Sequence, residues 1–370
     1  MSSTLATAVA PIRYQPAFEH PAPDEAKTQA SIDEQMRKIQ EKTFADGGKA
    51  IRSVHAKSHG LLVGELRVPA GLPVELAQGL FARAGTLPLV MRLSTIPGDI
   101  LPDDISTPRG MAIKIIGVQG ERLPGTEGDV TQDFILVNGP TFNSTDGRSF
   151  AKNLKLLAAT TDRAEGAKQV LSSAMRGLEK LVEAVGGQSA TLTSLGGHPE
   201  THPLGETYYS QVPVLWGDYF GKVCLRPVSP SLQALHKAPV EVDDRPDGLR
   251  DAVCAYFEEQ GGEWEFCVQL CRDIGEQPIE DATVAWDEAL SPYLPVARVV
   301  LGAQAAWSEA RAQSIDEGLS FSPWHGIAAH RPLGAVMRLR RQAYARAQEF
   351  RAQRNQRTLS EPKAIGDVGL

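Results

Sequence analysis

Apolar and polar residues alternate over several short stretches of the chain, which is the pattern of β-strands that bury one face. Four such stretches follow one another: LLVGELRV (61–68), LPLVMRLST (87–95), GMAIKIIGV (110–118) and DFILVNGPTF (133–142). Glycine and proline punctuate the chain between them, and strand-like stretches return at 205–226, 263–271 and 296–301. We therefore expect a sheet of many short strands.

Other segments keep apolar residues at helical intervals. An amphipathic helix is predicted over residues 31–45, started by Ser31, another helix over 167–185, and an arginine-rich helix over 335–357. Strands with helices on both sides, and no βαβ alternation, predict an α+β fold around an antiparallel sheet or barrel. We expect an extended N-terminal arm over 1–30, a single domain over 31–357 and a C-terminal tail over 358–370.

Composition narrows the function classes. The 370 residues carry a net charge of −7, which argues against a nucleic-acid partner. The sequence has no apolar run of about 18 residues and no signal-peptide pattern at its start, so we expect no membrane span. The four cysteines show neither CxxC spacing nor the density of a disulfide scaffold. Cys267 and Cys271 are expected to be buried thiols, and a cytoplasmic location fits.

The arginine-rich helix carries the first candidate site. Arg340, Tyr344 and Arg351 are spaced so that they share one stripe of the helix. Ionising a free phenol at pH 7 costs about 4 kcal/mol, and a nearby guanidinium supplies much of that. A tyrosine bracketed by arginines therefore favours a phenolate, which is one of the few protein ligands used for haem iron.

Two histidine pairs offer an alternative metal site. His55 and His59 lie four residues apart, but the strand that follows them separates their side chains. His198 and His202 lie in GGHPETHPLG, where Pro199 and the glycines forbid an ordinary helix. A histidine-ligated metal centre is therefore the less favoured interpretation.

Several motifs, in the right order, resemble those of the haem catalases. RSVHAKSHGLLVGELRV (52–68) resembles the distal signature of that family, and the RxxxY of the last helix resembles the proximal one. The intervening similarity lies in MRLSTIPGD (91–99), TPRGMAIKI (107–115), DFILVNGPTFNSTDGRSF (133–150), WEFCVQL (264–270) and FSPWHGIAAHRPLG (321–334). The resemblance runs from about residue 45 to 355. It is strongest to compact catalase-related proteins, a group that includes peroxidases and fatty-acid hydroperoxide isomerases.

The resemblance implies a catalase-like antiparallel β-barrel that encloses haem b, with flanking helices and a C-terminal proximal helix. Tyr344 would ligate the iron, and His55 would move a proton between the two oxygens of a bound peroxide, oriented by Ser94. The resemblance implies that Arg52, Arg92 and Arg351 bind the haem propionates and that Arg340 lies against Tyr344. It also implies that Phe142 and Phe150 contact the haem face. A core role for either phenylalanine is a close alternative.

One position departs from the family pattern. Val137 aligns with the distal asparagine, and Asn138 follows one residue later. A one-residue offset on a strand points to the opposite face. Either a bulge brings Asn138 into the pocket, or peroxide is oriented without that amide. Loss of the amide predicts poor dismutation of hydrogen peroxide with peroxidase activity retained.

The resemblance implies an enzyme that reduces or dismutates hydrogen peroxide or an organic hydroperoxide through a ferryl state, with a small organic electron donor. Val54, which precedes His55, favours this chemistry over that of the isomerases. Rearrangement or cleavage of a fatty-acid hydroperoxide, and haem binding without turnover, remain the alternatives. The resemblance also implies a homo-oligomer, which the N-terminal arm would help to form by wrapping a neighbour.

Overall fold

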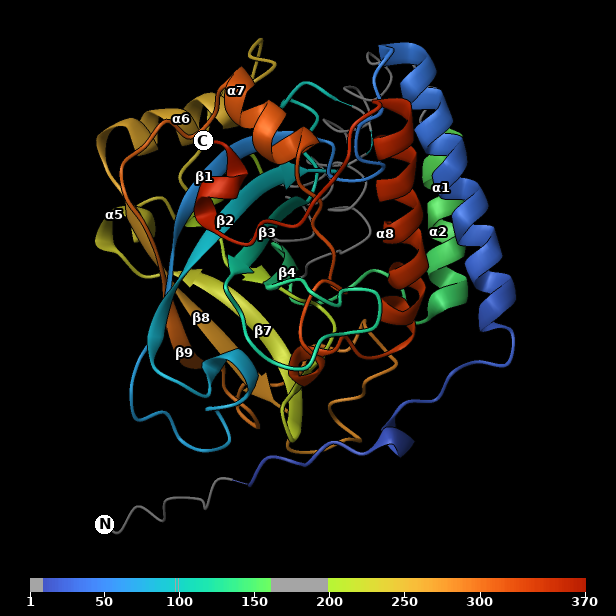
Figure 1. Ribbon diagram of the computed structural model, residues 1–370, viewed down its shortest axis with the longest axis vertical. Coiled ribbons are helices and arrows are strands. Elements are labelled where there is room, and N and C mark those ends of the chain that lie inside the picture. The colour runs from blue at the N-terminus through green and yellow to red at the C-terminus, as the bar shows by residue number, and fades with distance from the viewer. Residues whose placement is uncertain (1–8, 97, 99, 161–198) are drawn as a thin grey trace, which may run out of the picture.

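The computed structural model in Figure 1 describes residues 9–160 and 199–370, apart from Pro97 and Asp99. A single antiparallel sheet dominates it. Its strands are β1 (Lys57–Val68), β2 (Gly85–Thr95), β3 (Arg109–Ile116), β4 (Thr131–Val137), β5 (Tyr208–Tyr209), β6 (Val214–Trp216), β7 (Tyr219–Pro227), β8 (Gly262–Leu270) and β9 (Leu294–Leu301).

The sheet closes on itself. Its strand order is β5-β4-β3-β2-β1-β9-β8-β7-β6, and β5 pairs with β7 as well as with β4. That extra pairing joins eight strands into a barrel and leaves β6 as the outer arm of a hairpin with β7. The α+β fold built on an antiparallel barrel is thereby confirmed, and closure removes the exposed edges of an open sheet.

Strand alternation decides what lies inside the barrel. On β2, Met91 and Leu93 belong to the interior core, whereas Arg92 and Ser94 face outward. The interior is filled by packed side chains, among them the large aromatic groups Trp216, Trp264 and Phe266. The packed interior leaves the cavity outside the barrel wall, and the position of the haem stays a prediction.

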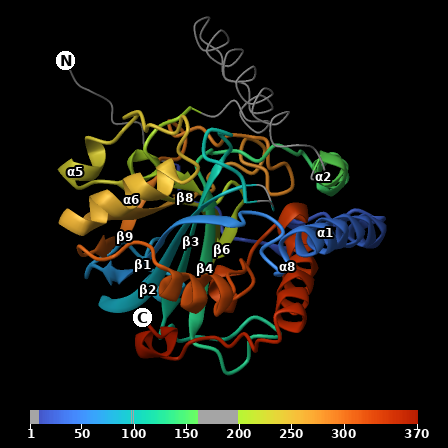
Figure 2. The same cartoon turned by 90° about the horizontal axis from the view of Figure 1, so that it is seen from above.

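The helices are α1 (Glu25–Gly47), α2 (Gly147–Thr160), α5 (Pro230–Gln233), α6 (Gly248–Glu259), α7 (Glu309–Arg311) and α8 (Ala335–Arg354). Short turns of other helices occur at Pro16–Phe18, Gly79–Phe81, Pro203–Gly205, Ala312–Glu317, Ala328–His330 and Ile365–Val368. Helices α1, α2 and α8 lie together on one side of the barrel (Figures 1 and 2) and share a small apolar core of Ile32, Ile39, Ala151, Leu154, Leu339 and Ala343.

Several predicted boundaries are corrected. Helix α1 begins at Glu25 rather than at Ser31. Pro21 and Pro23 prevent an earlier start, and no helix-breaking residue lies between Glu25 and Ser31. Thr28, in this first part of the helix, is already buried. Strand β4 ends at Val137, before the Asn-Gly-Pro turn residues. The stretch 205–226 forms parts of three strands, and α8 ends at Arg354. The helix predicted over 167–185 lies outside the described residues.

Both ends of the described chain pack on the barrel. The backbone N–H groups of Ile12 and Tyr14 donate to the carbonyl oxygens of Cys271 and Asp218, each at 2.8 Å. Val368, near the C-terminus, is buried against the outer face of the barrel. The division into an arm, a domain and a tail stays a prediction, although the two ends contact the barrel. Within the residues described, no helix has the combination of length and apolar character that crossing a membrane requires.

Candidate functional site

A cavity separates the outer face of the barrel wall from helix α8. Its walls come from β2, β3 and β4 on one side and from α8 and α1 on the other. Its lining includes the apolar residues Met36, Val54, Ala112, Ile135, Phe321, Ala343 and Ala347. The polar groups gather at a few points, which is the usual construction of a site for a largely apolar ligand.

His55 lies on the barrel side of this cavity, just before β1. Its backbone is in the left-handed region, with φ of 53°, a conformation uncommon for residues other than glycine. A side chain on Gly110 would sit 2.7 Å from the imidazole ring, so that glycine makes the space in which the ring lies. The Ser94 hydroxyl is 3.3 Å from Nδ1 of His55, which leaves Nε2 as the nitrogen that can meet a ligand.

The charge environment keeps His55 neutral. Burial, together with the positive charges of Arg92 and Arg340, lowers the pKa of His55 to about 3. The ring is therefore an unprotonated base at neutral pH. It can accept a proton from a bound ligand, and the same cationic surroundings favour its return.

Tyr344 faces the same cavity from helix α8. The residues on this stripe of the helix that line the cavity are Ala343, Tyr344, Ala347, Gln348 and Arg351. Small alanine side chains on either side of Tyr344 leave open space in front of the phenol. The structure thus brings Tyr344 and His55, which are 289 positions apart in the sequence, onto the walls of one cavity.

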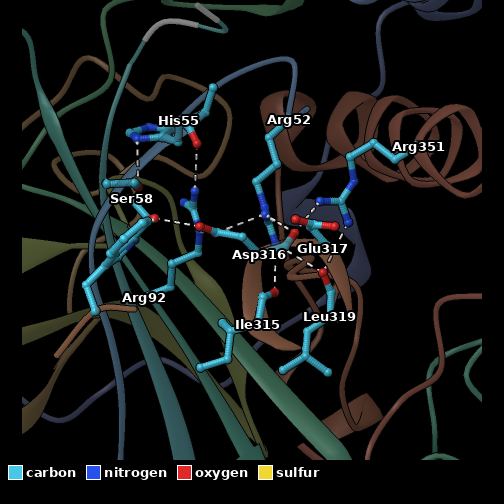
Figure 3. A network of polar contacts seen from close by, with 12 residues as sticks. Arg52, His55, Ser58, Arg92, Ile315, Asp316, Glu317, Leu319 and Arg351 are labelled. Carbon is cyan, nitrogen blue, oxygen red and sulfur yellow. Dashed lines mark hydrogen bonds and ion pairs between the residues drawn. The ribbon is translucent and has the colours of Figure 1, made fainter. Parts of the chain in front are cut away.

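Three arginines meet at one end of the cavity (Figure 3), and all of them contact the turn of π-helix at Ala312–Glu317. Arg92 donates from Nε to Asp316 Oδ1 at 2.5 Å, and Arg52 lies 3.2 Å from the same oxygen. Arg52 and Arg351 both donate to the backbone carbonyl oxygens of Asp316 and Leu319. We call Arg52, Arg92, Arg351 and Asp316 the arginine cluster.

This cluster has a surplus of positive charge. Arg52 and Arg92 share the carboxylate of Asp316, whose other oxygen accepts from the Ser58 hydroxyl at 2.5 Å, while Arg351 binds only backbone carbonyl oxygens and feels the charges of Asp316 and Glu317. Burial and the repulsion of neighbouring arginines lower the pKa of Arg52, and similar effects lower that of Arg351 to about 10. Three guanidinium groups thus outnumber the nearby carboxylates of Asp316 and Glu317 at the edge of an apolar cavity, an environment that favours a ligand with carboxylate groups.

Other predicted site residues lie away from the cavity lining. The guanidinium of Arg340 stacks over the ring of Phe142 at 5.1 Å, and Phe142 packs edge-on against Phe150 with ring centroids 5.4 Å apart. Phe142 and Phe150 belong to apolar clusters beside helix α8. The two phenylalanines are thus half-buried beside these clusters, and their place at a haem face stays a prediction.

Asn138 follows the last residue of β4 and is also outside the cavity lining. Its Oδ1 accepts from the backbone N–H of Arg109 at 2.9 Å, and its Nδ2 donates to Glu206 at 2.5 Å. Glu206 also pairs with the Arg109 guanidinium. The amide is therefore engaged by a polar network next to β3 rather than directed at a ligand.

Four contributors to the cavity were missed in the sequence. Phe321 and Met36 line it, Asp316 bridges the arginine cluster, and Gly110 makes room for the imidazole. Phe321 and Gly110 lie inside the catalase-like motifs FSPWHG and TPRG, so their position in those motifs could have assigned them to the site. Asp316 and Met36 come from segments with no motif, and only the packing of the chain reveals them.

A second buried ionic group lies behind the cavity. Lys114 donates to both carboxylate oxygens of Asp133 at 2.8 and 3.0 Å and also to Glu361. Nδ1 of His325 lies 3.3 Å from each of these carboxylates. We call these four residues the lysine cluster. Asp133, His325 and Glu361 have the side chains and proximity of metal ligands, but the Lys114 ammonium already supplies the cation between the carboxylates.

The two histidine pairs do not form shared sites among the described residues. His59 is buried, with Nε2 3.0 Å from the hydroxyl of Thr95, while His55 faces the cavity. Nδ1 of His202 accepts from the backbone N–H of Leu204 and thus caps a short turn. His198, its predicted partner, lies outside the described residues.

The fold is that of the catalases. The chain is similar to a fungal catalase (TM-score 0.59, 18% identity, 85% of this chain and 62% of the other). It is also similar to a bacterial catalase (TM-score 0.55, 18% identity, 84% and 59%) and to catalase A from Saccharomyces cerevisiae (TM-score 0.56, 16% identity, 84% and 63%). The chain spans about three fifths of the length of these proteins.

Comparisons at the level of sequence give no counterpart. No family model matches the chain, and no curated protein matches it either. The similarity to catalases thus lies in the arrangement of the barrel and helices, and the chemistry has to be argued from this chain's own residues.

Proposed function

We propose that this chain binds haem b between the barrel wall and helix α8 and acts on hydroperoxides. One observation carries the proposal: His55 and Tyr344 line a single apolar cavity whose end holds three arginines around one carboxylate. These features suit a flat apolar ligand that carries two carboxylates for the arginines and a metal ion that the Tyr344 phenolate can ligate. The catalase fold supports the same assignment.

The residues present fit the cofactor. Tyr344 would supply the iron ligand, and Arg52, Arg92 and Arg351 would hold the propionates with charge-assisted hydrogen bonds. The apolar lining would exclude water from the faces of the ring. When bound, the haem supplies the redox chemistry, and the protein supplies the ligand, the proton transfer and the access route.

His55 would act as the proton carrier. Its neutral ring can take the proton from the nearer oxygen of a hydroperoxide and hand it to the departing oxygen. The left-handed backbone, Gly110 and Ser94 hold the ring in one orientation, so little reorganisation accompanies the transfer. Val54 borders the same space and adds no hydroxyl group.

The position of Asn138 favours peroxidase activity over dismutation. Its amide is held by Glu206 and the backbone of Arg109 and does not line the cavity. A second hydrogen peroxide molecule would then lack that amide as an orienting donor. We propose a small organic reductant as the electron donor, with reduction of hydrogen peroxide or an organic hydroperoxide as the net reaction.

The test is an absorption spectrum of the protein titrated with haemin, with Tyr344→Phe and Tyr219→Phe measured in parallel. Tyr219 lies on β7 beside Arg13 and serves as the control. We expect a high-spin ferric spectrum in the wild type and in the control, and an altered or absent one in Tyr344→Phe. No haem uptake by the wild type would contradict the proposal.

Peroxide assays follow on the loaded protein. Oxidation of an organic donor with little oxygen release supports a peroxidase, and rapid oxygen release from hydrogen peroxide points to a catalase. Product analysis with a fatty-acid hydroperoxide separates reduction from rearrangement or cleavage. Normal haem content without turnover of any hydroperoxide would leave a haem-binding protein.

Location and assembly belong to the same proposal. All four cysteines are free thiols, as expected for a reducing compartment such as the cytoplasm. We propose a homo-oligomer, which gel filtration with light scattering tests directly.

A further inference from the structure

Two cysteines face each other on a part of the barrel wall away from the cavity. Cys224 of β7 and Cys267 of β8 are register partners in the antiparallel ladder. Their neighbours along each strand, such as Val223 and Phe266, point into the barrel core. The two thiols therefore point outward, where they are buried in a small cluster with Tyr209 and Tyr293.

The backbone already has the dimensions of a disulfide. Residues directly opposite each other in an antiparallel pair have Cα atoms about 4.5–5.5 Å apart. A disulfide spans Cα atoms about 4.4–6.8 Å apart. The side chains of Cys224 and Cys267 also belong to the same small buried cluster. A bond between the sulfurs thus needs side-chain rotation and no movement of the strands.

The other two cysteines are placed differently. Cys254 lies on α6 and is half-buried, whereas Cys271 is buried beyond the end of β8, with its Sγ 3.8 Å from the carbonyl oxygen of Gln277. Neither is a ladder partner of Cys224 or Cys267. The geometry therefore selects one pairing out of those that four cysteines allow.

We propose that Cys224 and Cys267 are an oxidation site, at which a hydroperoxide converts the two thiols into a reversible disulfide. One sulfur attacks the O–O bond and becomes a sulfenic acid, and an alcohol or water leaves. The second sulfur then displaces water from the sulfenic acid. In sum, two thiols and one hydroperoxide give one disulfide, one alcohol (or water) and one water. The inference takes the hydroperoxide from the proposed function but does not involve the haem.

The two steps have different speeds. The Cys267 thiol and burial raise the pKa of Cys224, so the reactive thiolate is scarce and the first step is slow. The second step is fast, because the partner sulfur is already in contact. A sulfenic acid formed at this pair is captured before further oxidation, whereas one formed at Cys254 has no ladder partner and proceeds to the sulfinic acid.

The experiment is a thiol map of the folded protein after treatment with hydrogen peroxide, both haem-free and haem-loaded. Remaining thiols are alkylated in denaturant, and peptides are analysed by mass spectrometry without reduction. We expect one cross-linked species that joins the peptides of Cys224 and Cys267, and its disappearance after dithiothreitol. Cys271 should remain a thiol.

Variants sharpen the result. Cys271→Ser should keep the cross-link, and Cys267→Ser should abolish it and leave Cys224 as a thiol or a higher oxide. The inference is overturned if Cys254 is oxidised while Cys224 and Cys267 stay as thiols, or if the cross-link involves Cys254 or Cys271. Because the map is read on haem-free protein too, a failure of haem binding leaves this result intact and is seen separately.

Discussion

Two buried ionic groups lie on the same outer face of the barrel, and they differ in charge balance. The arginine cluster has three cations around Asp316, and the pKa values of Arg52 and Arg351 are lowered. The lysine cluster has one cation between two carboxylates. Burial alone would lower the pKa of Lys114, but Asp133 and Glu361 outweigh it and raise that pKa.

The opposite shifts separate a ligand site from a structural one. In the lysine cluster every charge has a partner within the chain, and the contacts fasten the C-terminal segment to β3 and β4. In the arginine cluster the partners are too few, and the surplus borders an open cavity. This surplus of buried positive charge next to open space is the reason for proposing the arginine cluster as the place where a ligand's carboxylates bind.

The largest expected effect is on stability. Lys114→Met would leave the buried carboxylates of Asp133 and Glu361 without their cation, and removing one member of a buried ion pair costs about 3–5 kcal/mol. Urea unfolding of the haem-free protein measures this loss. The matched control is Lys38→Met, which removes an exposed pair with Glu34 and should cost less than about 1 kcal/mol. Equal effects in the two variants would contradict the structural role of the lysine cluster.

The next effect is on ligand affinity. Arg351→Gln should weaken haem binding about ten- to a hundredfold, because a hydrogen bond to a charged group contributes about 1.5–3 kcal/mol. Arg354→Gln is the control on the same helix, since Arg354 stacks over the ring of Phe44 at 5.0 Å and does not line the cavity. Both affinities come from absorbance titrations with haemin. Weaker binding in Arg354→Gln than in Arg351→Gln would argue against the arginine cluster as the propionate site.

Acid pH tests the buried surroundings of His55 and the positive charges of Arg92 and Arg340 beside it. The folded-state pKa of His55 is about 3, below the unfolded value near 6.5, so the unfolded chain binds more protons between these values. The stability that His55 contributes is therefore complete above pH 6.5 and declines as the pH falls toward 3. His55→Asn should flatten this dependence by at most about 1.4 kcal/mol per pH unit. Chemical unfolding at several pH values measures the slope, and identical slopes in both proteins would refute the assignment.

The smallest effect is stabilisation by a simple dicarboxylate. Succinate should bind the arginine cluster and stabilise the haem-free protein by about 0.8 kcal/mol at a free concentration of about three times its Kd. The gain, measured by thermal unfolding against chloride at equal ionic strength, should shrink in Arg351→Gln and persist in Arg354→Gln. A gain of the same size in Arg351→Gln would locate the anion elsewhere.

Local patterns foretold much of the fold. Alternation along β2 puts Met91 and Leu93 in the core and Arg92 and Ser94 outside, and the same rule holds on β3. Helical spacing predicted Arg340, Tyr344 and Arg351 on one stripe of α8; Tyr344 and Arg351 line the cavity, whereas Arg340 stacks over Phe142. These predictions succeeded because strand and helix periodicity fix which neighbours share a face, whatever the rest of the chain does.

The positions that the sequence specifies least lie where distant segments meet. Phe142 and Phe150 read as ligand-facing aromatics, yet they pack with Arg340 and with each other beside α8. Asn138 carries an amide suited to a peroxide, but Glu206 and Arg109 engage it. Side chains in loops after a strand follow the path of the chain, and periodicity does not specify that path.

By itself, the sequence determined the strands, the last helix, and the presence of His55 and of the arginines that the site uses. Tertiary structure alone decided that the cavity lies outside the barrel, that Asp316 pairs with both Arg52 and Arg92, and that Gly110 leaves space for the imidazole. The reason is physical: periodicity is a property of neighbouring residues, whereas charge balance and free volume arise only where segments far apart in the chain are packed together.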